Sequence, residues 1–267
     1  MTEENKHPFL LPDERIDEVN EQIRLIQKRQ GLTFGTDAYL LSAFVRPQPY
    51  DRAVDLGSGT GIIPLLLCAK NKVREVTAVE IQPSFASLIA RNAELNGFAD
   101  RITVLNTDVR TLSSDQMGGE VGLVVSNPPY LKTNTGRTNR AAEKELARHE
   151  VCGGIFDFCA AASRLLRTKG RFVCVFRPER MTDLFSAMRA NRLEPKRMVT
   201  VHSDLNASPS VILTEAVKDA APSLSVLPPL FLYEVLQAPD SRRKMTAYAE
   251  QIYQSCSFPD RKTADER

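Results

Sequence analysis

The sequence predicts an α/β fold built on a mainly parallel sheet, and three features support this. From residue 52 onward, short apolar runs alternate with segments of helical pattern, which favours parallel strands covered by helices on both faces. A glycine-rich turn joins the first of these strands to the helix that follows it. Two later apolar runs are separated only by residues 203–208, so we expect them to pair antiparallel.

The core elements follow from this alternation in chain order. Strands are expected at residues 53–56, 76–80, 102–105, 121–125, 171–176, 198–202 and 209–216. Helices are expected at residues 62–69, 85–95, 156–166 and 178–192, with a short helix between 105 and 121. The result is a seven-stranded, mainly parallel sheet that ends in an antiparallel hairpin.

The segment before this core is less regular. Residues 1–12 read as a loose leader, and 16–30 fit a helix or a strand, although 23–26 fits a strand better. A helix is expected over residues 38–45, capped by Thr36 or Asp37 and closed by two prolines. We therefore divide the chain into an N-terminal extension (1–50), a core domain (51–236) and a polar C-terminal tail (237–267) with one amphipathic piece at 245–253.

The composition is that of an ordinary globular chain, with 42% hydrophobic and 25% charged residues in 267. No run approaches the roughly 18 apolar residues of a membrane span, and the N-terminus lacks the apolar core of a signal peptide. Five cysteines, without C-x-x-C spacing and mostly in apolar segments, predict buried free thiols. We expect a cytoplasmic protein that uses neither a membrane nor a metal. A monomer is compatible with the sequence, which does not define the oligomeric state.

The turn after the first strand, Asp55–Gly61, has the pattern D-x-G-x-G-x-G. A dinucleotide fold also uses a glycine-rich turn, but its third glycine would fall on Ile62. The spacing instead resembles that of S-adenosylmethionine methyltransferases, which form a Rossmann-like class I fold. This resemblance implies that the loop passes beside the sulfonium and amino-acid tail of the cofactor, with contacts from Asp55, Gly57, Ser58, Gly59 and Gly61.

Acidic residues follow the next two expected strands. Glu80 ends the second strand about twenty residues past the glycine loop, where a carboxylate can accept both ribose hydroxyls. Asp108 follows the third strand and is placed to accept from the adenine amino group of the cofactor, with Val109 beside it. A single acid at a strand end is usually only an exposed residue. Three acids at successive strand ends after one glycine loop indicate an S-adenosylmethionine site.

The fourth strand ends in Asn127-Pro128-Pro129-Tyr130. Proline fixes φ and restricts the residue before it, so this segment forms a short, stiff arm. The fourth strand lies beside the first in the expected topology, which places the arm across the crevice from the glycine loop. A plain turn is the alternative interpretation, because Asn-Pro is common in turns.

The arm resembles the N-P-P-Y signature of methyltransferases that modify planar amino nitrogens: adenine N6, cytosine N4 and the glutamine amide. The resemblance implies that the Asn127 side-chain oxygen and the Pro128 carbonyl accept the two hydrogens of the target amino group. This moves the nitrogen lone pair out of the ring plane, toward the methyl group. Pro129 stiffens the arm, and Tyr130 stacks on the base. The motif contains no dedicated histidine or lysine base, so catalysis would rest on orientation and electrostatics.

Further segments resemble one family, the bacterial tRNA (adenine-N6)-methyltransferases that act on the adenine 3′ to the anticodon of valine tRNA. They are residues 32–38 (LTFGTDA), the N-P-P-Y-L-K arm, 147–150 (ARHE), 176–180 (FRPER) and 193–197 (LEPKR). The resemblance covers roughly residues 9–235. It implies tRNA, bound through its anticodon stem-loop, as the substrate. It also implies Thr36, Asp37 and Asn127 as cofactor contacts, and Phe34 beside the target base.

Basic residues gather around the arm although the net charge is only +2. The loop beyond the arm carries Lys132, Arg137, Arg140, Lys144 and Arg148, which we expect to bind substrate. Residues 164–197 hold ten basic residues against three acidic ones, and six of them could extend a phosphate track: Arg177, Arg180, Arg189, Arg192, Lys196 and Arg197. A solvated helix face is the simpler interpretation of such a charge cluster.

Other functions remain open at this point. Glutamine methyltransferases of peptide-chain release factors use the same arm, but they carry a longer helical domain before the glycine loop than the roughly 50 residues found here. DNA adenine methylation would need a target-recognition domain that we do not find. An inactive binding module would not need Asp55, Glu80, Asp108 and Asn127 together.

Overall fold

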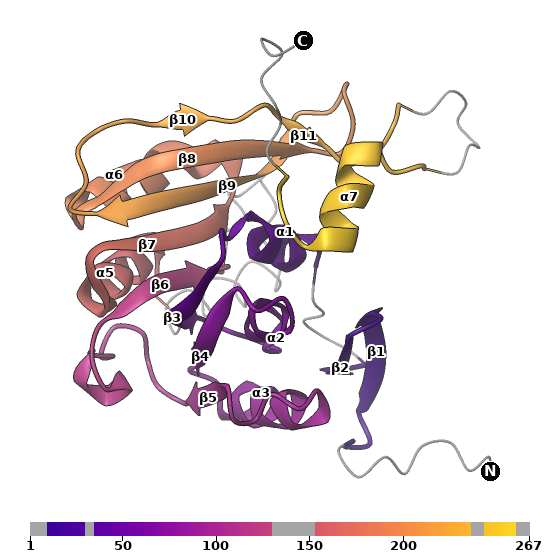
Figure 1. Cartoon of the computed structure of the whole chain (residues 1–267), viewed down its shortest axis with the longest axis vertical. Coiled ribbons are helices and arrows are strands. Elements are labelled where there is room, and N and C mark those ends of the chain that lie inside the picture. The colour runs from indigo at the N-terminus through magenta and orange to yellow at the C-terminus, as the bar shows by residue number, and fades with distance from the viewer. Residues whose placement is uncertain (1–9, 30–34, 130–152, 236–242, 260–267) are drawn as a thin grey trace, which may run out of the picture.

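A central sheet with helices on both faces organises the chain (Figure 1). The computed structural model describes residues 10–29, 35–129, 153–235 and 243–259. The main strands are β3 (Gln48–Leu56), β4 (Val73–Val79), β5 (Ile102–Leu105), β6 (Val121–Ser126), β7 (Leu166–Phe176), β8 (Leu193–His202) and β9 (Pro209–Lys218). Two short strands, β10 (Ser225–Val226) and β11 (Leu230–Phe231), pair with β8.

The strand order is β10-β8-β9-β7-β6-β3-β4-β5. Strands β3 to β7 are mutually parallel, whereas β9 is antiparallel to both β7 and β8. The seven expected strands and the closing antiparallel hairpin are therefore confirmed, and β10 and β11 extend the sheet to nine strands. The order reverses at β3, which has β4 on one side and β6 on the other. At such a switch point the connections leave in opposite directions and open a crevice at the carboxyl ends of the strands.

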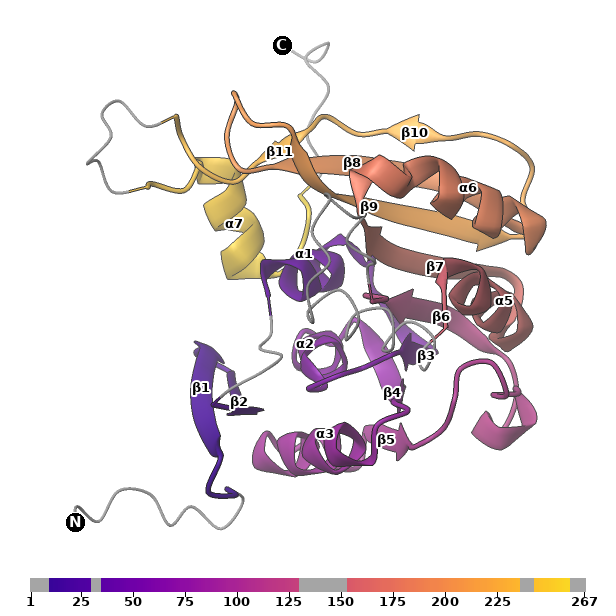
Figure 2. The same ribbon diagram turned by 180° about the vertical axis from the view of Figure 1, so that it is seen from behind.

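Helices cover the two faces of the sheet unequally (Figures 1 and 2). One face carries α1 (Thr36–Phe44), α2 (Ile62–Ala69) and α3 (Pro83–Leu95), and the other carries α5 (Ile155–Leu165) and α6 (Met181–Ala190). Side chains of β6 alternate between the two cores: Val125 lies with the α1 and α2 residues, and Val124 with the α5 and α6 residues.

Three helical predictions need adjustment. The helix expected over 178–192 is a 3-10 turn, η2 (Pro178–Arg180), followed by α6, and the short helix before β6 is also 3-10, η1 (Asp115–Met117). The expected cap of α1 by Thr36 or Asp37 is wrong, because Gly35 is the N-cap residue and no side chain caps it. Thr36 and Asp37 lie inside the first turn of the helix, so neither is its N-cap residue.

A β-hairpin precedes the core domain. Its strands are β1 (Glu14–Asn20) and β2 (Ile23–Lys28), which confirms the strand interpretation of 23–26. The buried Asn92 of α3 accepts from the Ile26 amide (2.7 Å) and donates to the carbonyls of Ile26 (3.0 Å) and Thr60 (2.9 Å). One side chain thus joins the hairpin, α3 and the glycine loop.

The C-terminal segment contains a helix that packs on α1. In α7 (Ala247–Ser255), Ala249 and Ile252 are buried in the same core as α1. The Tyr39 hydroxyl donates to the Tyr253 carbonyl (2.5 Å), and the two rings stack with centroids 4.9 Å apart. This helix lies within the segment expected to be a polar tail, and the division into domains stays a prediction.

Four cysteines are free and buried, as the sequence predicts: Cys68, Cys159, Cys174 and Cys256. Cys152 lies outside the described residues. Burial raises the pKa of Cys68 to about 11 and that of Cys159 to about 12, so these thiols stay protonated and unreactive.

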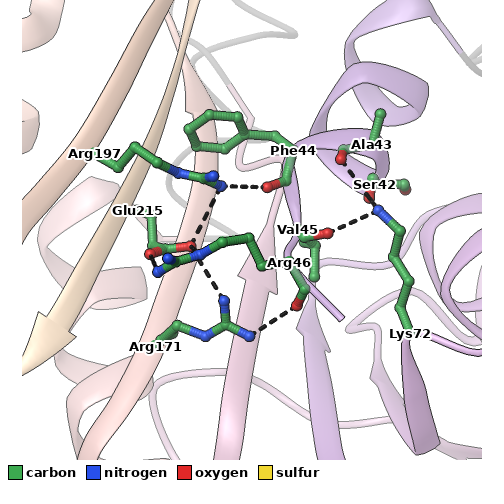
Figure 3. Close-up of polar contacts among 9 residues, drawn as sticks. All are labelled: Ser42, Ala43, Phe44, Val45, Arg46, Lys72, Arg171, Arg197 and Glu215. Carbon is green, nitrogen blue, oxygen red and sulfur yellow. Dashed lines mark hydrogen bonds and ion pairs between the residues drawn. The ribbon is translucent and has the colours of Figure 1, made fainter. Parts of the chain in front are cut away.

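Cationic side chains hold the C-terminal end of α1 (Figure 3). Lys72 donates to the carbonyls of residues 42, 43 and 45, Arg197 to that of Phe44 (2.5 Å), and Arg171 to that of Arg46 (2.8 Å). The fully buried Glu215 accepts from Arg171, Arg197 and Arg46. These groups, the α1 clamp, satisfy carbonyls that a helix end leaves without partners.

We predict that Glu215→Gln lowers the free energy of unfolding by about 3–5 kcal/mol, because removing one partner leaves buried cations uncompensated. Urea denaturation monitored by circular dichroism measures this change. Glu194→Gln is the matched control, because Glu194 pairs with the exposed Arg189 and should cost less than about 1 kcal/mol. Equal effects for the two variants would show that the clamp does not stabilise the fold.

Candidate active site

The glycine loop is folded against the end of β4. The amides of Gly57 and Ser58 donate to the Val79 carbonyl at 2.9 and 3.0 Å. Gly57 (φ 75°) and Gly61 (φ 82°) are left-handed, and a Cβ on Gly61 would lie 3.0 Å from Ile89. Side chains would strain both positions, so the loop presents bare backbone that a ligand can approach closely.

Glu80 is tied to this loop. Its carboxylate accepts from the amides of Gly59 and Gln82, both at 2.9 Å, and the side chain is buried. Asn106, after β5, donates to the Glu80 carbonyl at 2.8 Å and fixes its backbone. A carboxylate has about four acceptor positions, so this one keeps capacity for ligand hydroxyls.

Asp55 is an uncompensated acid at the base of the loop. Its side chain is fully buried, and neither carboxylate oxygen has a hydrogen-bond partner in the described part of the chain. Burial is the main cause that raises the pKa of Asp55 to about 7; the nearby Ser58 hydroxyl opposes the rise, and the negative charge of Glu80 adds to it. Such a group needs a cation or a donor to stay ionised.

Asp108 has a partner of its own. Arg110 donates to it from the backbone amide (2.8 Å), from Nε and from the guanidinium (2.5 Å), and this contact lowers the pKa of Asp108. Asp108 is therefore an ionised acceptor at the end of β5. Val109 beside it is buried beneath α5. Arg164 donates to the Val109 carbonyl (2.9 Å) and holds this turn.

The arm begins beside the glycine loop. Leu56 of β3 pairs in register with Ser126 of β6, and the Ser126 hydroxyl donates to the Leu56 carbonyl at 2.8 Å. Asn127 and Gly57 are thus the next residues on adjacent parallel strands. Asn127 is half-buried, Pro128 is buried and Pro129 is exposed. By alternation, Asp55 and Asn127 lie on the α1 side of the sheet.

The first turn of α1 borders the same edge of the sheet. Asp37 is half-buried, and burial raises its pKa while the positive charge of Arg177 opposes the rise. Arg177 directly follows β7, the neighbour of β6, and donates to the Ser210 carbonyl at 3.2 Å. Asp37 therefore lies within electrostatic reach of the strand that borders the arm.

Several predicted site residues lie outside the described residues: Phe34, Tyr130, Lys132, Arg137, Arg140, Lys144 and Arg148. Their roles stay predictions. Thr36 is exposed in the first turn of α1, and Ser58 is buried and donates to the Asp55 carbonyl at 3.0 Å.

The expected phosphate track is mostly engaged within the protein. Ion pairs join Arg180 to Asp183 (2.9 Å), Arg189 to Glu194 (3.1 Å) and Arg192 to Asp219 (2.7 Å). Lys196 donates to the Ala221 carbonyl at 3.0 Å. Arg197 belongs to the α1 clamp and covers the Phe44 ring at 4.0 Å. Arg197 therefore does not form a surface for phosphates.

Sequence reasoning missed Ser126, Asn106 and Phe158. Phe158 packs its ring against Gly57, where a Cβ would lie 3.4 Å away. Ser126 is a polar residue at the end of an apolar run, and Asn106 directly follows a strand. Both positions could therefore have been recognised in the sequence as polar residues at strand ends. Phe158 resembles any other apolar helix residue and carried none.

A cleft of about 690 Å³ lies away from these groups. It is bordered by the hairpin turn at Asn20, by Tyr39, by Lys70 at the end of α2, and by Tyr253. Of the predicted site residues that the structure describes, it includes only Thr36. The buried acid and the arm are absent from its walls, so we place the chemistry at the glycine loop and not in this cleft.

Within the described ranges, no helix has the length and apolar character needed to cross a membrane. No group of three or more potential metal ligands occurs there.

Comparison with known proteins gives the class first. The family model described as "Methyltransferase small domain" matches residues 29–191, more than half of the chain. A solved structure of a predicted O-methyltransferase from Agrobacterium tumefaciens superposes with a TM-score of 0.66 at 22% identity, over 85% of this chain and all of that one. The chain therefore has the class I methyltransferase fold and belongs to the methyltransferase small domain family.

Curated relatives refine this assignment. A "tRNA1(Val) (adenine(37)-N6)-methyltransferase" from Porphyromonas gingivalis is 31% identical over 69% of this chain and 74% of that protein. One of the same name from a Flavobacteriaceae bacterium is 26% identical over 84% and 93%. The chain belongs to the family of these methyltransferases, which confirms the resemblance found in the sequence.

The buried acid predicts an unusual pH dependence of the cofactor-free protein. The folded protein holds a proton on Asp55 that the unfolded chain releases above about pH 4, so the free energy of unfolding should fall as pH rises from about 4 to 7. Asp55→Asn removes this loss. Its gain in stability over wild type should grow by roughly 3 kcal/mol between about pH 5 and 8.

Urea denaturation at the two pH values measures the difference. Asp183→Asn is the control, because its carboxylate is exposed and paired with Arg180. Parallel pH profiles for wild type and Asp55→Asn would mean that Asp55 is not an uncompensated buried acid.

Proposed function

We propose that this protein is an S-adenosylmethionine-dependent methyltransferase that methylates N6 of an adenine in tRNA, at position 37 of valine tRNA. Family membership supports the enzyme class. The observation that carries the reaction is the in-register pairing of Leu56 with Ser126, because it supports an arm at Asn127 that starts beside the glycine loop. We further propose that the enzyme acts in the cytoplasm.

The residues around the loop fit S-adenosylmethionine. The orphaned Asp55 carboxylate suits the positive amino-acid end of the cofactor, because a cation would restore its ionised form. Glu80 suits the ribose hydroxyls, and Asp108 with the Val109 backbone suits the adenine. Gly57, Ser58, Gly59 and Gly61 give close backbone approach, while Thr36 and Asp37 border the open side. When bound, the cofactor supplies an electrophilic methyl group.

The arm would act on the target nitrogen. The Asn127 side-chain oxygen and the Pro128 carbonyl accept the two hydrogens of the adenine amino group and turn its lone pair out of the ring plane. Pro128 and Pro129 hold these acceptors in place at little entropic cost on binding. The gain is electrostatic preorganisation, so no strong base is required.

The choice of tRNA rests on the relatives and on the basic loop. The relatives' names specify a valine tRNA, and the sequence of residues 130–152 carries five basic residues against three acidic ones. An anticodon-loop base is poorly stacked, which lowers the cost of moving it into the site. Phe34 and Tyr130 would contact that base, and Lys132, Arg137, Arg140, Lys144 and Arg148 its phosphates.

Asn127→Ala should lower the methylation rate roughly 10²- to 10³-fold, because it removes one acceptor for the target amino group. Affinity for S-adenosylmethionine, measured by calorimetry, should stay within several-fold of wild type. Asn191→Ala, at the far end of α6, is the control and should leave both quantities unchanged. Full activity of Asn127→Ala would rule out the polarising role.

The substrate class can be tested with labelled S-adenosylmethionine and separate pools of tRNA, rRNA and release factors. We expect label in tRNA, recovered as N6-methyladenosine after nucleoside digestion. The tRNA affinity should also fall steeply with salt, by roughly one log-log slope unit per neutralised phosphate. Label in the release factors would instead identify the chain as a glutamine methyltransferase.

A further inference from the structure

Arg177 is a charged residue that the proposed mechanism does not use. It directly follows β7 and is half-buried. The next basic residue along the chain, Arg180, is held in an ion pair with Asp183 (2.9 Å). Arg177 instead donates from Nη1 to the neutral Ser210 carbonyl at 3.2 Å, a bond that does not by itself cancel its charge. Its position in the sheet is what relates Arg177 to the proposed site.

The register of β6 and β7 places Arg177 beside the start of the arm. Ser126 pairs with Cys174 on these parallel strands. Asn127 therefore lies opposite Val175, two residues before Arg177. The Arg177 backbone is extended (φ −79°, ψ 133°), and a residue before a proline, such as Asn127, is extended as well. A strand spacing of about 4.8 Å and a rise of about 3.3 Å per residue then put the Cα atoms of Asn127 and Arg177 roughly 8 Å apart.

The Arg177 side chain lies on the same face of the sheet as Asn127. Val175 packs in the core with the α1 and α2 residues, and Phe176 in the core with the α5 and α6 residues. Alternation therefore puts Arg177 on the α1 side, where Asn127 also lies. Electrostatics agree, because the positive charge of Arg177 counteracts the rise in the pKa of Asp37, in the first turn of α1. Register, alternation and charge thus indicate one position for the guanidinium, beside the arm and the first turn of α1.

A guanidinium at this position suits a phosphate group. Its planar fork of N–H donors matches the oxygens of a phosphodiester, and arginine does not lose its proton in proteins. The substrate of the proposed function is a nucleic acid, so the base that reaches Asn127 brings its own backbone phosphates to this edge of the sheet. The bond to the Ser210 carbonyl and the charge of Asp37 also restrict the side chain before substrate arrives. Binding then costs less side-chain entropy.

We propose that Arg177 binds a backbone phosphate next to the target adenine of the RNA substrate. This inference rests on the proposed function and adds a substrate contact to it. The contact would fix the sugar and phosphate while Asn127 and Pro128 act on the amino group. Phosphate contacts position a nucleic acid without reading its sequence. Arg177 would therefore place the target nucleotide and leave the choice of tRNA to other residues.

The test uses an unmodified valine tRNA transcript and measures its Kd at several salt concentrations, its KM and kcat, and the Kd for S-adenosylmethionine. Arg177→Gln should raise the tRNA Kd and KM roughly 10- to 100-fold, because a hydrogen bond between charged groups is lost. The log-log dependence of tRNA affinity on salt should become shallower by about one slope unit. Cofactor affinity should stay unchanged, and kcat should change less than KM.

Two further variants separate the phosphate contact from a general effect of charge. Arg177→Lys keeps the charge and should retain the salt slope of wild type. Arg74→Gln is the matched control, because the exposed Arg74 pairs with Glu75 near the start of β4, at the opposite edge of the sheet. It removes the same charge and should leave the tRNA Kd and the salt slope unchanged. An effect of Arg74→Gln as large as that of Arg177→Gln would overturn the inference.

A second arm of the experiment locates the phosphate. Wild type and Arg177→Gln are compared on anticodon stem-loops that carry one uncharged methylphosphonate linkage on either side of the target adenine. At one of the two linkages, wild type should bind more weakly than it binds the intact RNA, whereas Arg177→Gln should bind both RNAs equally. Such non-additivity is the signature of a direct contact. Additive losses at both linkages would contradict the proposed contact.

The outcomes separate this inference from the proposed function. If wild type methylates no tRNA, the proposed function fails before any variant is compared. If wild type methylates tRNA and Arg177→Gln binds tRNA with the Kd and salt slope of wild type, the inference alone fails. A lower midpoint of urea unfolding or a loss of cofactor affinity in Arg177→Gln would assign the residue to the fold and would also reject the inference.

Discussion

The hydrogen bond from the Ser126 hydroxyl to the Leu56 carbonyl closes the pairing of β3 with β6, and the site depends on this pairing. Both strands end at these residues, so the glycine loop and the arm start side by side. A slip of one residue would turn Asn127 to the opposite face, because side chains alternate along a strand. The buried strand pair therefore sets the distance and the orientation between the glycine loop and the start of the arm at Asn127.

The second wall of the site is held from a distance. Helix α1 reaches the site with its first turn, where Asp37 lies, while its last turn is fixed by Lys72, Arg171 and Arg197. Cations near a helix C-terminus also interact favourably with its dipole. The helix is therefore a rigid element that is anchored at its far end. The contacts that fix its position lie in the core and not at the site.

The core could be predicted from the sequence because its apolar runs are short, regular and separated by clear turn signals. The same holds for Asp55, Glu80 and Asn127, whose places at strand ends follow from the topology alone. Partner choice could not be predicted. Arg197 looked like a phosphate ligand, yet its cross-strand partner is the buried Glu215, and that pairing depends on the register of β8 and β9. The prediction for the cap of α1 was also wrong, because Gly35 is the N-cap residue and the helix already includes Thr36 and Asp37.

Asp55, which has no hydrogen-bond partner among the described residues, would couple the proposed cofactor to the stability of the whole chain. A buried charge without a partner among the described residues lowers the free energy of unfolding of the cofactor-free protein. A cationic ligand that pairs with this charge would raise the free energy of unfolding again. Any ligand that binds only the folded state shifts the folding equilibrium in proportion to the logarithm of its concentration. In a cell whose methyl-donor supply is low, more of this protein would be open to unfolding and proteolysis. If Asp55 binds the methyl donor as proposed, this acid links the lifetime of the enzyme to the supply of its own cofactor.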